Sequence, residues 1–291
     1  MKQIHLIMIS LAAALVCACG PAVDANLEMA DGSDGHLEYT NARQTIAVKI
    51  NSNTSWKAVS DADWLVVETA KGEAGEDVEI QFTLAPNADY AYRDAIITVT
   101  AGKATLQIYV TQQPQLLYLI NENFDSEDLI MEATFTNGWY GDNNAALDVD
   151  GDGFGWRRIK DTETGMTYAY SCSYQEDLDR ILSPDNWLVS PRVTIPATGF
   201  LLRWDAKGYD PDPQYLGDKY EVYIADYDDG QPLQLLSKVC EEVTTSATRL
   251  TSHKIELDAY VGRRICLAFH HYESYNLSKV MITNVEISNR R

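Results

Sequence analysis

Hydrophobic and polar residues alternate along much of this chain, which is the pattern of β-strands with one buried face. The alternation is clearest over residues 78–84, where Val78, Ile80, Phe82 and Leu84 are separated by polar side chains. It recurs over residues 46–50, 97–99 and 106–110, with turn-forming pairs such as Lys71-Gly72 and Gly102-Lys103 between the runs. Short strands at this spacing, over about 75 residues, predict a β-sandwich.

A second set of alternating runs begins after Pro114, and it predicts a larger domain. Its strands are expected at residues 200–204, 220–224, 265–269 and 283–287, with long loops between them. No amphipathic helix stands out. We therefore predict an all-β chain in which an Ig-like β-sandwich, residues 38–113, is followed by a larger jelly-roll β-sandwich, residues 114–291.

The first residues predict export rather than part of the fold. An apolar run over residues 4–16 follows Lys2 and leads into Cys17-Ala18-Cys19, which is too short to span a bilayer and is typical of a secretory signal. The cysteines resemble a bacterial lipobox, and the small Ala18 favours Cys19 as the lipidated residue. Residues 1–19 are then the signal, and the acidic residues 20–37 are predicted to be a disordered tether. Ordinary signal cleavage is the alternative.

Composition limits the classes of binding partner and the use of disulfides. The 291 residues carry a formal net charge of -20, which disfavours binding to a phosphate backbone and excludes a nucleic-acid partner. Beyond the signal the cysteines are Cys172, Cys240 and Cys266, an odd number that cannot form a complete disulfide framework. Cys266 lies in a predicted strand and is expected to be a buried thiol.

An acidic loop is the strongest candidate for a metal site. Asp148, Asp150 and Asp152 occupy alternate positions and Gly153 follows, as in the first half of a calcium loop. An EF-hand also needs a bidentate Glu at position twelve, where this chain has Ile159. The remaining calcium ligands would have to come from distant segments. A solvated Asp-Gly turn is the alternative.

Short motifs in the first domain resemble the BACON domain, a module of Bacteroidetes surface proteins. They are the segments 53–56, 64–67, 93–95 and 110–113, in this order. The resemblance implies a spacer at least as well as a glycan-binding module. Trp56 and Trp64 would stack on sugar rings if they were exposed, but large aromatic residues are usually buried, so both are expected in the core.

The second domain resembles the cleaved-adhesin family of gingipain adhesin modules, also described as choice-of-anchor J. The matching segments are 122–125, Gly138-Trp139, 148–156, 183–191, 219–224, 257–262, 268–272 and 282–287. Their ordered set covers roughly residues 116–290. The resemblance implies a jelly-roll module that binds calcium and serves attachment rather than catalysis.

The same resemblance implies further calcium ligands. Its early acidic position is Asp125 here, with Glu122 nearby, and the acidic position near the last strand is Asn284. Asp and Asn both offer oxygen ligands, although fewer charges generally weaken calcium binding. We expect a structural Ca²⁺ held by some of Glu122, Asp125, Asn284 and the Asp148–Asp152 loop.

Aromatic residues in the second domain are the candidate ligand contacts. Tyr209 and Tyr215 flank an acidic, proline-containing loop that suits contact with a glycan or a protein, although a plain surface crossover is equally compatible. Trp156 is the third predicted contact. His270 and His271 follow one another in a predicted strand, and one is expected to be packed and the other exposed.

No catalytic residues are predicted. The chain has no Gly-x-Ser-x-Gly elbow, His-Glu-x-x-His pair or phosphate loop. The favoured function is that of a non-catalytic lipoprotein on the bacterial outer surface, for adhesion or carbohydrate binding, with a glycan or a host or envelope protein as partner. A structural or assembly component of the envelope is the alternative, and a glycan-processing enzyme is a distant third.

Overall fold

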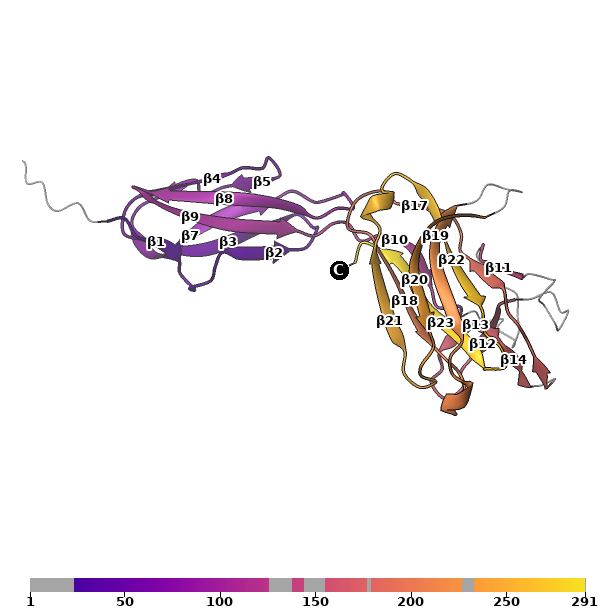
Figure 1. The fold of residues 1–291 in the computed structure, drawn as a ribbon. Coiled ribbons are helices and arrows are strands. Elements are labelled where there is room, and N and C mark those ends of the chain that lie inside the picture. Colours follow the sequence, from indigo (N-terminus) through magenta and orange to yellow (C-terminus); the bar gives the residue numbers. More distant parts are fainter. Residues whose placement is uncertain (1–23, 126–137, 144–154, 177–178, 227–232, 291) are drawn as a thin grey trace, which may run out of the picture. The chain divides into compact units, whose positions relative to one another are not determined.

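The computed structural model describes residues 24–125, 138–143, 155–176, 179–226 and 233–290. The chain divides into two compact units (Figure 1). The first contains residues up to 37, 43–85 and 94–110, and the second contains 38–42, 86–93 and 111–291. Three short segments of the predicted first domain are thus grouped with the second unit. In the described part of the chain, no helix is both long and apolar enough to span a bilayer.

Two sheets lie wholly or largely in the first unit. One has the order β1-β3-β7-β5 and the other β2-β9-β8-β4-β6. The strands are β1 (Leu27–Met29), β2 (His36–Tyr39), β3 (Gln44–Ser52), β4 (Trp56–Ser60), β5 (Leu65–Val67), β6 (Lys71–Gly72), β7 (Gly75–Leu84), β8 (Arg93–Ala101) and β9 (Ala104–Gln112).

The core of the first unit follows the alternation seen in the sequence. Ile80, Phe82 and Leu84 are fully buried on β7, while the polar residues between them face outward. Trp56 is also buried, as expected, and Trp64 is partly exposed. The indole of Trp56 packs so closely on Gly72 that a Cβ there would lie 2.5 Å from the ring, so any larger residue would displace it.

The structure corrects the predicted disordered tether. Part of that segment, Leu27–Met29, forms β1 and pairs with β3, and Met29 is buried. The Asn53 side chain secures the strand by accepting from the backbone N–H of Asn26 at 2.8 Å and donating to the carbonyl of Asp24. Two alternating apolar residues are too few to distinguish such a strand from a polar linker. The signal segment and Cys19 lie outside the described residues.

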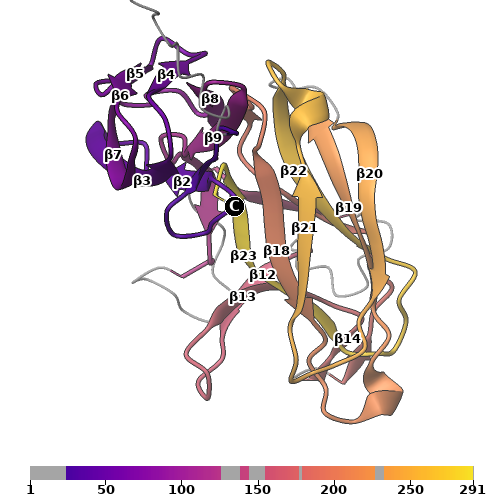
Figure 2. The ribbon, with the colours of Figure 1, turned by 90° about the vertical axis from the view of Figure 1, so that its left-hand side faces the viewer.

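The second unit is an all-β sandwich of two larger sheets, which confirms the predicted fold class. One sheet has the order β12-β13-β23-β18-β21, with β10 also paired to β23; the other has the order β11-β16-β22-β19-β20, with β17 also paired to β22 (Figure 2). The strands are β10 (Tyr118–Glu122), β11 (Tyr140–Asn143), β12 (Arg157–Lys160), β13 (Thr167–Cys172), β14 (Tyr174–Gln175), β15 (Arg180–Ile181), β16 (Asn186–Val189), β17 (Val193–Thr194), β18 (Leu201–Lys207), β19 (Lys219–Asp226), β20 (Gln234–Val243), β21 (Thr251–Glu256), β22 (Arg264–Tyr272) and β23 (Lys279–Ser288).

Side chains of both sheets meet in one core. The four runs predicted as strands lie in β18, β19, β22 and β23, and their alternate apolar residues are buried there. Trp204 on β18 lies edge-on to Phe269 on β22, with ring centroids 6.1 Å apart, so the pair joins the two sheets. Short 3-10 helices at Pro213–Tyr215 and Asp258–Tyr260 lie in the connections.

Candidate ligand-binding face

The outward face of the β11-β16-β22-β19-β20 sheet carries a row of aromatic and charged side chains. Trp187 on β16 lies opposite His270 on β22, and His270 lies opposite Glu221 on β19. Because side chains alternate along a strand, these residues point away from the core that their neighbours Leu188, Phe269 and Val222 fill. We call Trp187, Tyr223, His270, Tyr272, Glu221 and Asp185 the aromatic face.

The rings of the aromatic face pack against one another. The ring of His270 stacks on Trp187, with centroids 3.8 Å apart and planes 7° apart, and on Tyr272 at 5.0 Å. Tyr223 lies 5.8 Å from Trp187. The three large rings remain partly exposed to solvent. Aromatic surface held in one conformation can contact a ligand with little loss of side-chain entropy.

Carboxylates border the aromatic rings. His270 Nε2 lies 2.7 Å from Asp185 Oδ1, and Nδ1 lies 3.4 Å from Glu221 Oε2. Lys238 Nζ donates to Glu221 Oε1 at 2.8 Å. Burial opposes ionisation of Glu221, but hydrogen bonds from Lys238, Tyr223 and His270 outweigh it and lower the pKa of this carboxyl. Glu221 therefore stays a hydrogen-bond acceptor at neutral pH.

The tyrosine hydroxyls of the aromatic face stay protonated. Burial, together with the hydrogen bond to Glu221 at 2.7 Å, raises the pKa of Tyr223 to about 12. Burial also raises the pKa of Tyr272 to about 12. The face thus combines neutral hydroxyls, fixed carboxylates and aromatic surface, which is the mixture of groups that binds polyhydroxylated ligands.

The local sequence explains how Trp187 is held. Asn186 Nδ2 donates to the backbone carbonyl of Gly155 at 3.1 Å and to the hydroxyl of Ser171 at 2.9 Å. The backbone carbonyl of Asn186 accepts from Trp156 Nε1. A Cβ on Gly155 would come within 2.8 Å of the Asn186 side chain, so glycine permits this contact. The start of β16 is therefore fixed on both sides, and Trp187 projects outward from a rigid strand.

The structure corrects one predicted ligand contact. Trp156 is only 2% exposed and belongs to the core, so its ring cannot meet a ligand. Tyr209 and Tyr215 are 37% and 40% exposed, and Lys279 Nζ lies 3.8 Å from the centre of the Tyr209 ring. Both tyrosines are accessible, and their role in binding stays a prediction.

The predicted calcium ligands are only partly described. Asp148, Asp150 and Asp152 lie outside the described residues. Glu122 is paired in register with Val285, the neighbour of Asn284, so the two segments lie on adjacent strands. The side chains of Asn284 and Asp125 have separate partners. Asn284 Nδ2 donates to Asp205 Oδ2 at 2.7 Å, and Asp125 Oδ1 lies 3.7 Å from Lys160 Nζ. The calcium site stays a prediction.

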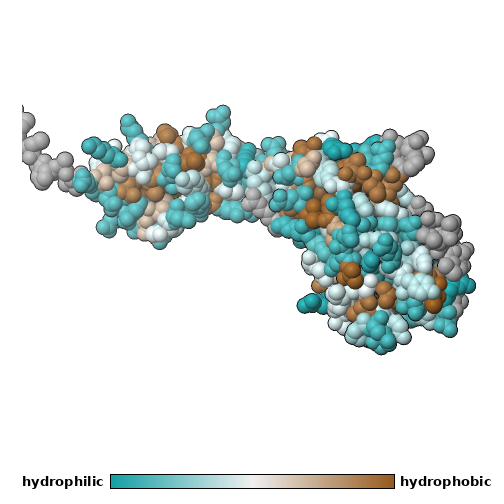
Figure 3. Space-filling model, in the orientation of Figure 1, coloured by the Kyte–Doolittle hydropathy of each residue, from teal (hydrophilic) through white to brown (hydrophobic). Residues whose placement is uncertain are grey.

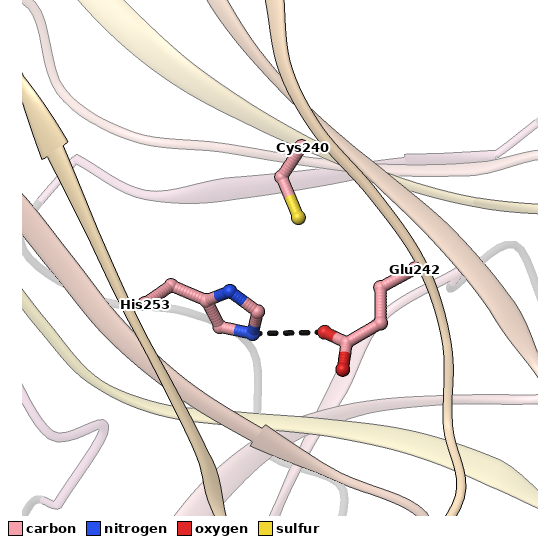
Figure 4. A group of neighbouring side chains, drawn as sticks. All are labelled: Cys240, Glu242 and His253. Atoms are coloured by element: carbon pink, nitrogen blue, oxygen red, sulfur yellow. Dashed lines mark ion pairs between the residues drawn. The ribbon is translucent and has the colours of Figure 1, made fainter.

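A different group of potential metal ligands lies at one edge of the second unit. Cys240 and Glu242 on β20 meet His253 on β21, and one ligand atom of each lies within 4.8 Å of the others (Figure 4). Among the described residues, no other three His, Cys, Asp or Glu side chains come this close together. Burial opposes protonation of His253, but hydrogen bonds with Cys240 and Glu242 outweigh it and raise its pKa to about 9.

A buried Ser–His–Asp chain is the third polar cluster. Ser171 Oγ lies 2.8 Å from His271 Nδ1, and His271 Nε2 lies 3.1 Å from Asp218 Oδ1. A hydrolytic serine must meet its substrate, whereas Ser171 is 1% exposed and accepts from Asn186. This row of hydrogen bonds therefore connects β13 and β22 to the segment before β19.

Of the two adjacent histidines, one was expected to be packed and the other exposed. His271 is packed, but His270 is also largely buried, with 12% of its side chain exposed.

The comparisons with known proteins identify the family. The profile of the Cleaved Adhesin Domain matches residues 128–287, more than half of the chain. The chain belongs to the cleaved adhesin domain family. The viral BACON domain matches residues 31–115 of this cleaved adhesin protein. Both resemblances expected from the sequence are thereby confirmed.

Relatives of this cleaved adhesin protein come from Porphyromonas gingivalis. Hemagglutinin A is 26% identical over 214 residues, which cover 66% of this chain and 8% of the relative. Lys-gingipain W83 is 26% identical over 157 residues, which cover 48% of this chain and 9% of the relative. The chain thus spans less than a tenth of the length of the curated relatives it matches.

Solved structures that resemble the cleaved adhesin protein include an adhesin domain and a carbohydrate-binding module. The K1 cleaved adhesin domain of Lys-gingipain from P. gingivalis W83 is 22% identical, with a TM-score of 0.43, and the match covers 60% of this chain and 97% of that domain. The carbohydrate-binding module TmCBM61, solved with β-1,4-galactotriose, is 14% identical, with a TM-score of 0.36 and a match over 53% of this chain and 90% of that module.

Sequence reasoning did not find the aromatic face or the cluster at the sheet edge. A signal for the first was present, since Trp187, Glu221 and His270 all lie in family-like segments, and Glu221 and His270 also lie next to residues of predicted strands. No comparable signal marked the second. Cys240 and His253 lie on strands whose residues are mostly exposed or half-buried, so no hydrophobic alternation revealed those strands.

Proposed function

We propose that this cleaved adhesin protein is a non-catalytic adhesin that binds glycans through the aromatic face of its second unit. The observation that carries the proposal is the row of Trp187, His270 and Tyr272 stacked beside Asp185 and Glu221. Aromatic rings contact the apolar faces of sugars, and the partly exposed carboxylate of Asp185 can accept hydrogen bonds from sugar hydroxyls, whereas Glu221 is buried and helps to hold His270 in place. Relatives named Hemagglutinin A support a role in attachment.

A protein partner is the second candidate, and one observation favours it. Leu235, Leu236 and Val243 on β20 are exposed large hydrophobic residues. Figure 3 shows hydrophobic residues in small groups separated by hydrophilic ones on the face drawn. A stable protein interface usually needs a larger continuous apolar area. Glycan binding is the favoured function because the aromatic face is a defined cluster of rings and polar groups.

The test is glycan binding by the full chain and by Trp187→Ala. We expect the wild type to bind a subset of glycans on an array, and the substitution to weaken binding at least about tenfold, which is about 1.4 kcal/mol. Affinities would be measured by calorimetry on one glycan from the array. Tyr275→Ala, which removes a ring 65% exposed in the same unit, is the matched control.

Glycan binding by the loop residues Tyr209 and Tyr215, instead of by the aromatic face, is the competing assignment. If Tyr209→Ala or Tyr215→Ala abolished binding while Trp187→Ala left it unchanged, the ligand would be bound by the loop rather than the aromatic face. If the wild type bound no glycan but bound an envelope protein, the proposal would be replaced by the second candidate. Thermal unfolding of each variant shows whether a loss of binding comes from a loss of fold.

We also propose that Cys19 carries a lipid that holds the protein at the outer surface of the cell envelope, with the first unit as a spacer. The apolar run over residues 4–16 and the small Ala18 support it. Metabolic labelling with a fatty-acid analogue should label the wild type, and Cys19→Ala should be unlabelled and released from membranes. Cys17→Ala is the control, and label retained by Cys19→Ala would exclude Cys19.

A structural Ca²⁺ in the second unit is the last part of the proposal. Support comes from the Asp148–Asp152 loop and from the pairing of β10 with β23, which places Glu122 next to the segment of Asn284. Asn284 also lies at a bulge with φ 52°. Backbone held in this region by a residue other than glycine is enriched at ligand sites. Oxygen ligands from both strands would let the ion stabilise their pairing.

A further inference from the structure

The edge of the sandwich where β20 and β21 lie is held together by polar side chains. Each strand is the last of its sheet, so contacts between them connect the two layers where the core ends. His253 Nε2 on β21 lies 2.8 Å from Glu242 Oε2 on β20. The His253 ring also stacks on Trp204, with centroids 4.5 Å apart and planes 11° apart, so the imidazole is held in one orientation.

The ligand set at this edge suits a borderline transition metal. A thiol, an imidazole and a carboxylate, from Cys240, His253 and Glu242, have ligand atoms within 4.8 Å of one another. Zn²⁺ binds these three ligand types at about 2.0 to 2.3 Å, whereas Ca²⁺ and Mg²⁺ prefer oxygen alone. In Figure 4 the three side chains converge on a common space.

A second layer of hydrogen bonds orients the carboxylate. The buried Tyr220 hydroxyl donates to Glu242 Oε2 at 2.5 Å, and Trp204 Nε1 lies 3.4 Å from the same hydroxyl. Metal ligands in proteins are commonly held by such outer partners. The cluster therefore has ordered ligands together with the groups that would order them around an ion.

A shallow surface pocket reaches Glu242, one of the three residues of the cluster. Tyr220, Glu242 and Thr244 line it, along with Lys207 and Thr251. Thr244 Oγ1 is buried and has no hydrogen-bond partner among the described residues.

We propose that Cys240, Glu242 and His253 bind one Zn²⁺, which joins the edge strands of the two sheets. Binding displaces the thiol proton of Cys240 and the proton between His253 and Glu242, and it forms bonds from Sγ, the imidazole nitrogen and a carboxylate oxygen to the ion. Cys240 and Glu242 lie on the inner side of β20, so this site is separate from the aromatic face.

The test uses the full chain, freed of metal by chelation and titrated with Zn²⁺ in a calorimeter. We expect one Zn²⁺ per chain, with proton release that appears as a dependence of the heat on the buffer. Co²⁺ in place of Zn²⁺ should give a thiolate-to-cobalt absorption band in the near ultraviolet. Cys240→Ser should abolish that band and weaken Zn²⁺ binding at least about tenfold, and His253→Gln should weaken it similarly.

Controls separate this site from adventitious binding. Cys172→Ser and His36→Gln remove another cysteine and another histidine and should leave the affinity and the cobalt band unchanged. Zn²⁺ should also raise the melting temperature of the wild type but not of Cys240→Ser. Unchanged binding in Cys240→Ser, or Co²⁺ binding without a thiolate band, would overturn the proposal. If His253→Gln failed to fold, Cys240→Ser alone would decide.

Discussion

Replacing Asp218 by alanine should destabilise the second unit by about 3 to 5 kcal/mol, because it removes one partner of a buried charged or hydrogen-bonded group. Asp218 is fully buried, and its carboxylate accepts from the hydroxyl of Ser173 at 2.5 Å and from the backbone N–H of Ser278 at 3.1 Å. It also contacts His271 Nε2. Alanine would leave all three groups without an acceptor in a place that water does not reach.

Urea unfolding followed by tryptophan fluorescence would measure this loss. Asp218→Asn should cost less than Asp218→Ala, because the amide keeps an oxygen acceptor of similar size. Glu256→Ala, at an exposed position of β21, is the control and should change stability by no more than about 0.5 kcal/mol. A loss below about 1 kcal/mol in Asp218→Ala would mean that this polar cluster is dispensable for the fold.

Calcium should produce the second largest effect. An ion that binds only the folded state stabilises it by about 2.7 kcal/mol at a hundredfold excess over its Kd. The full chain should therefore melt at a higher temperature in millimolar Ca²⁺ than in chelator. Asp150→Asn, in the predicted ligand loop, should lose most of this difference, since it removes a charged oxygen ligand.

Hydrogen exchange can place the calcium effect within the chain. Chelation should speed exchange in β10 and β23, next to the predicted ligands, and leave β7 in the first unit unchanged as an internal control. Identical melting curves in chelator and in Ca²⁺ would refute a structural calcium ion. A uniform change in both units would instead indicate a general salt effect.

The strands with one buried face could be predicted from the sequence. In β7 and β18 the apolar side chains recur at every second residue, and burial in the structure largely follows that period. In β19, β22 and β23 the large apolar residues at alternate positions fill the core, but the residues between them are mostly buried too. Strand period is a property of adjacent residues, so it needs no knowledge of the partner strand. The predicted burial of Cys266 is confirmed, but its side chain alternates with the core residues Ile265 and Leu267 and packs in a separate cluster with Val189 and Ala268.

Sites made of residues far apart in sequence could not be predicted in the same way. Trp187 and His270 are 83 positions apart, and only the pairing of β16 with β22 stacks their rings. The same limit explains the error at Trp156. An aromatic residue beside an acidic loop has the composition of a binding site, and only packing decides whether the ring is covered.

By itself the sequence determined the all-β class, the family and the main strands, because alternation and short motifs are encoded locally. The tertiary structure decided which polar residues meet. His253 and Glu242 lie on edge strands of different sheets, and their contact depends on how the two sheets stack. Stacking depends on the register and packing of the whole sandwich, so no local pattern in the chain records it.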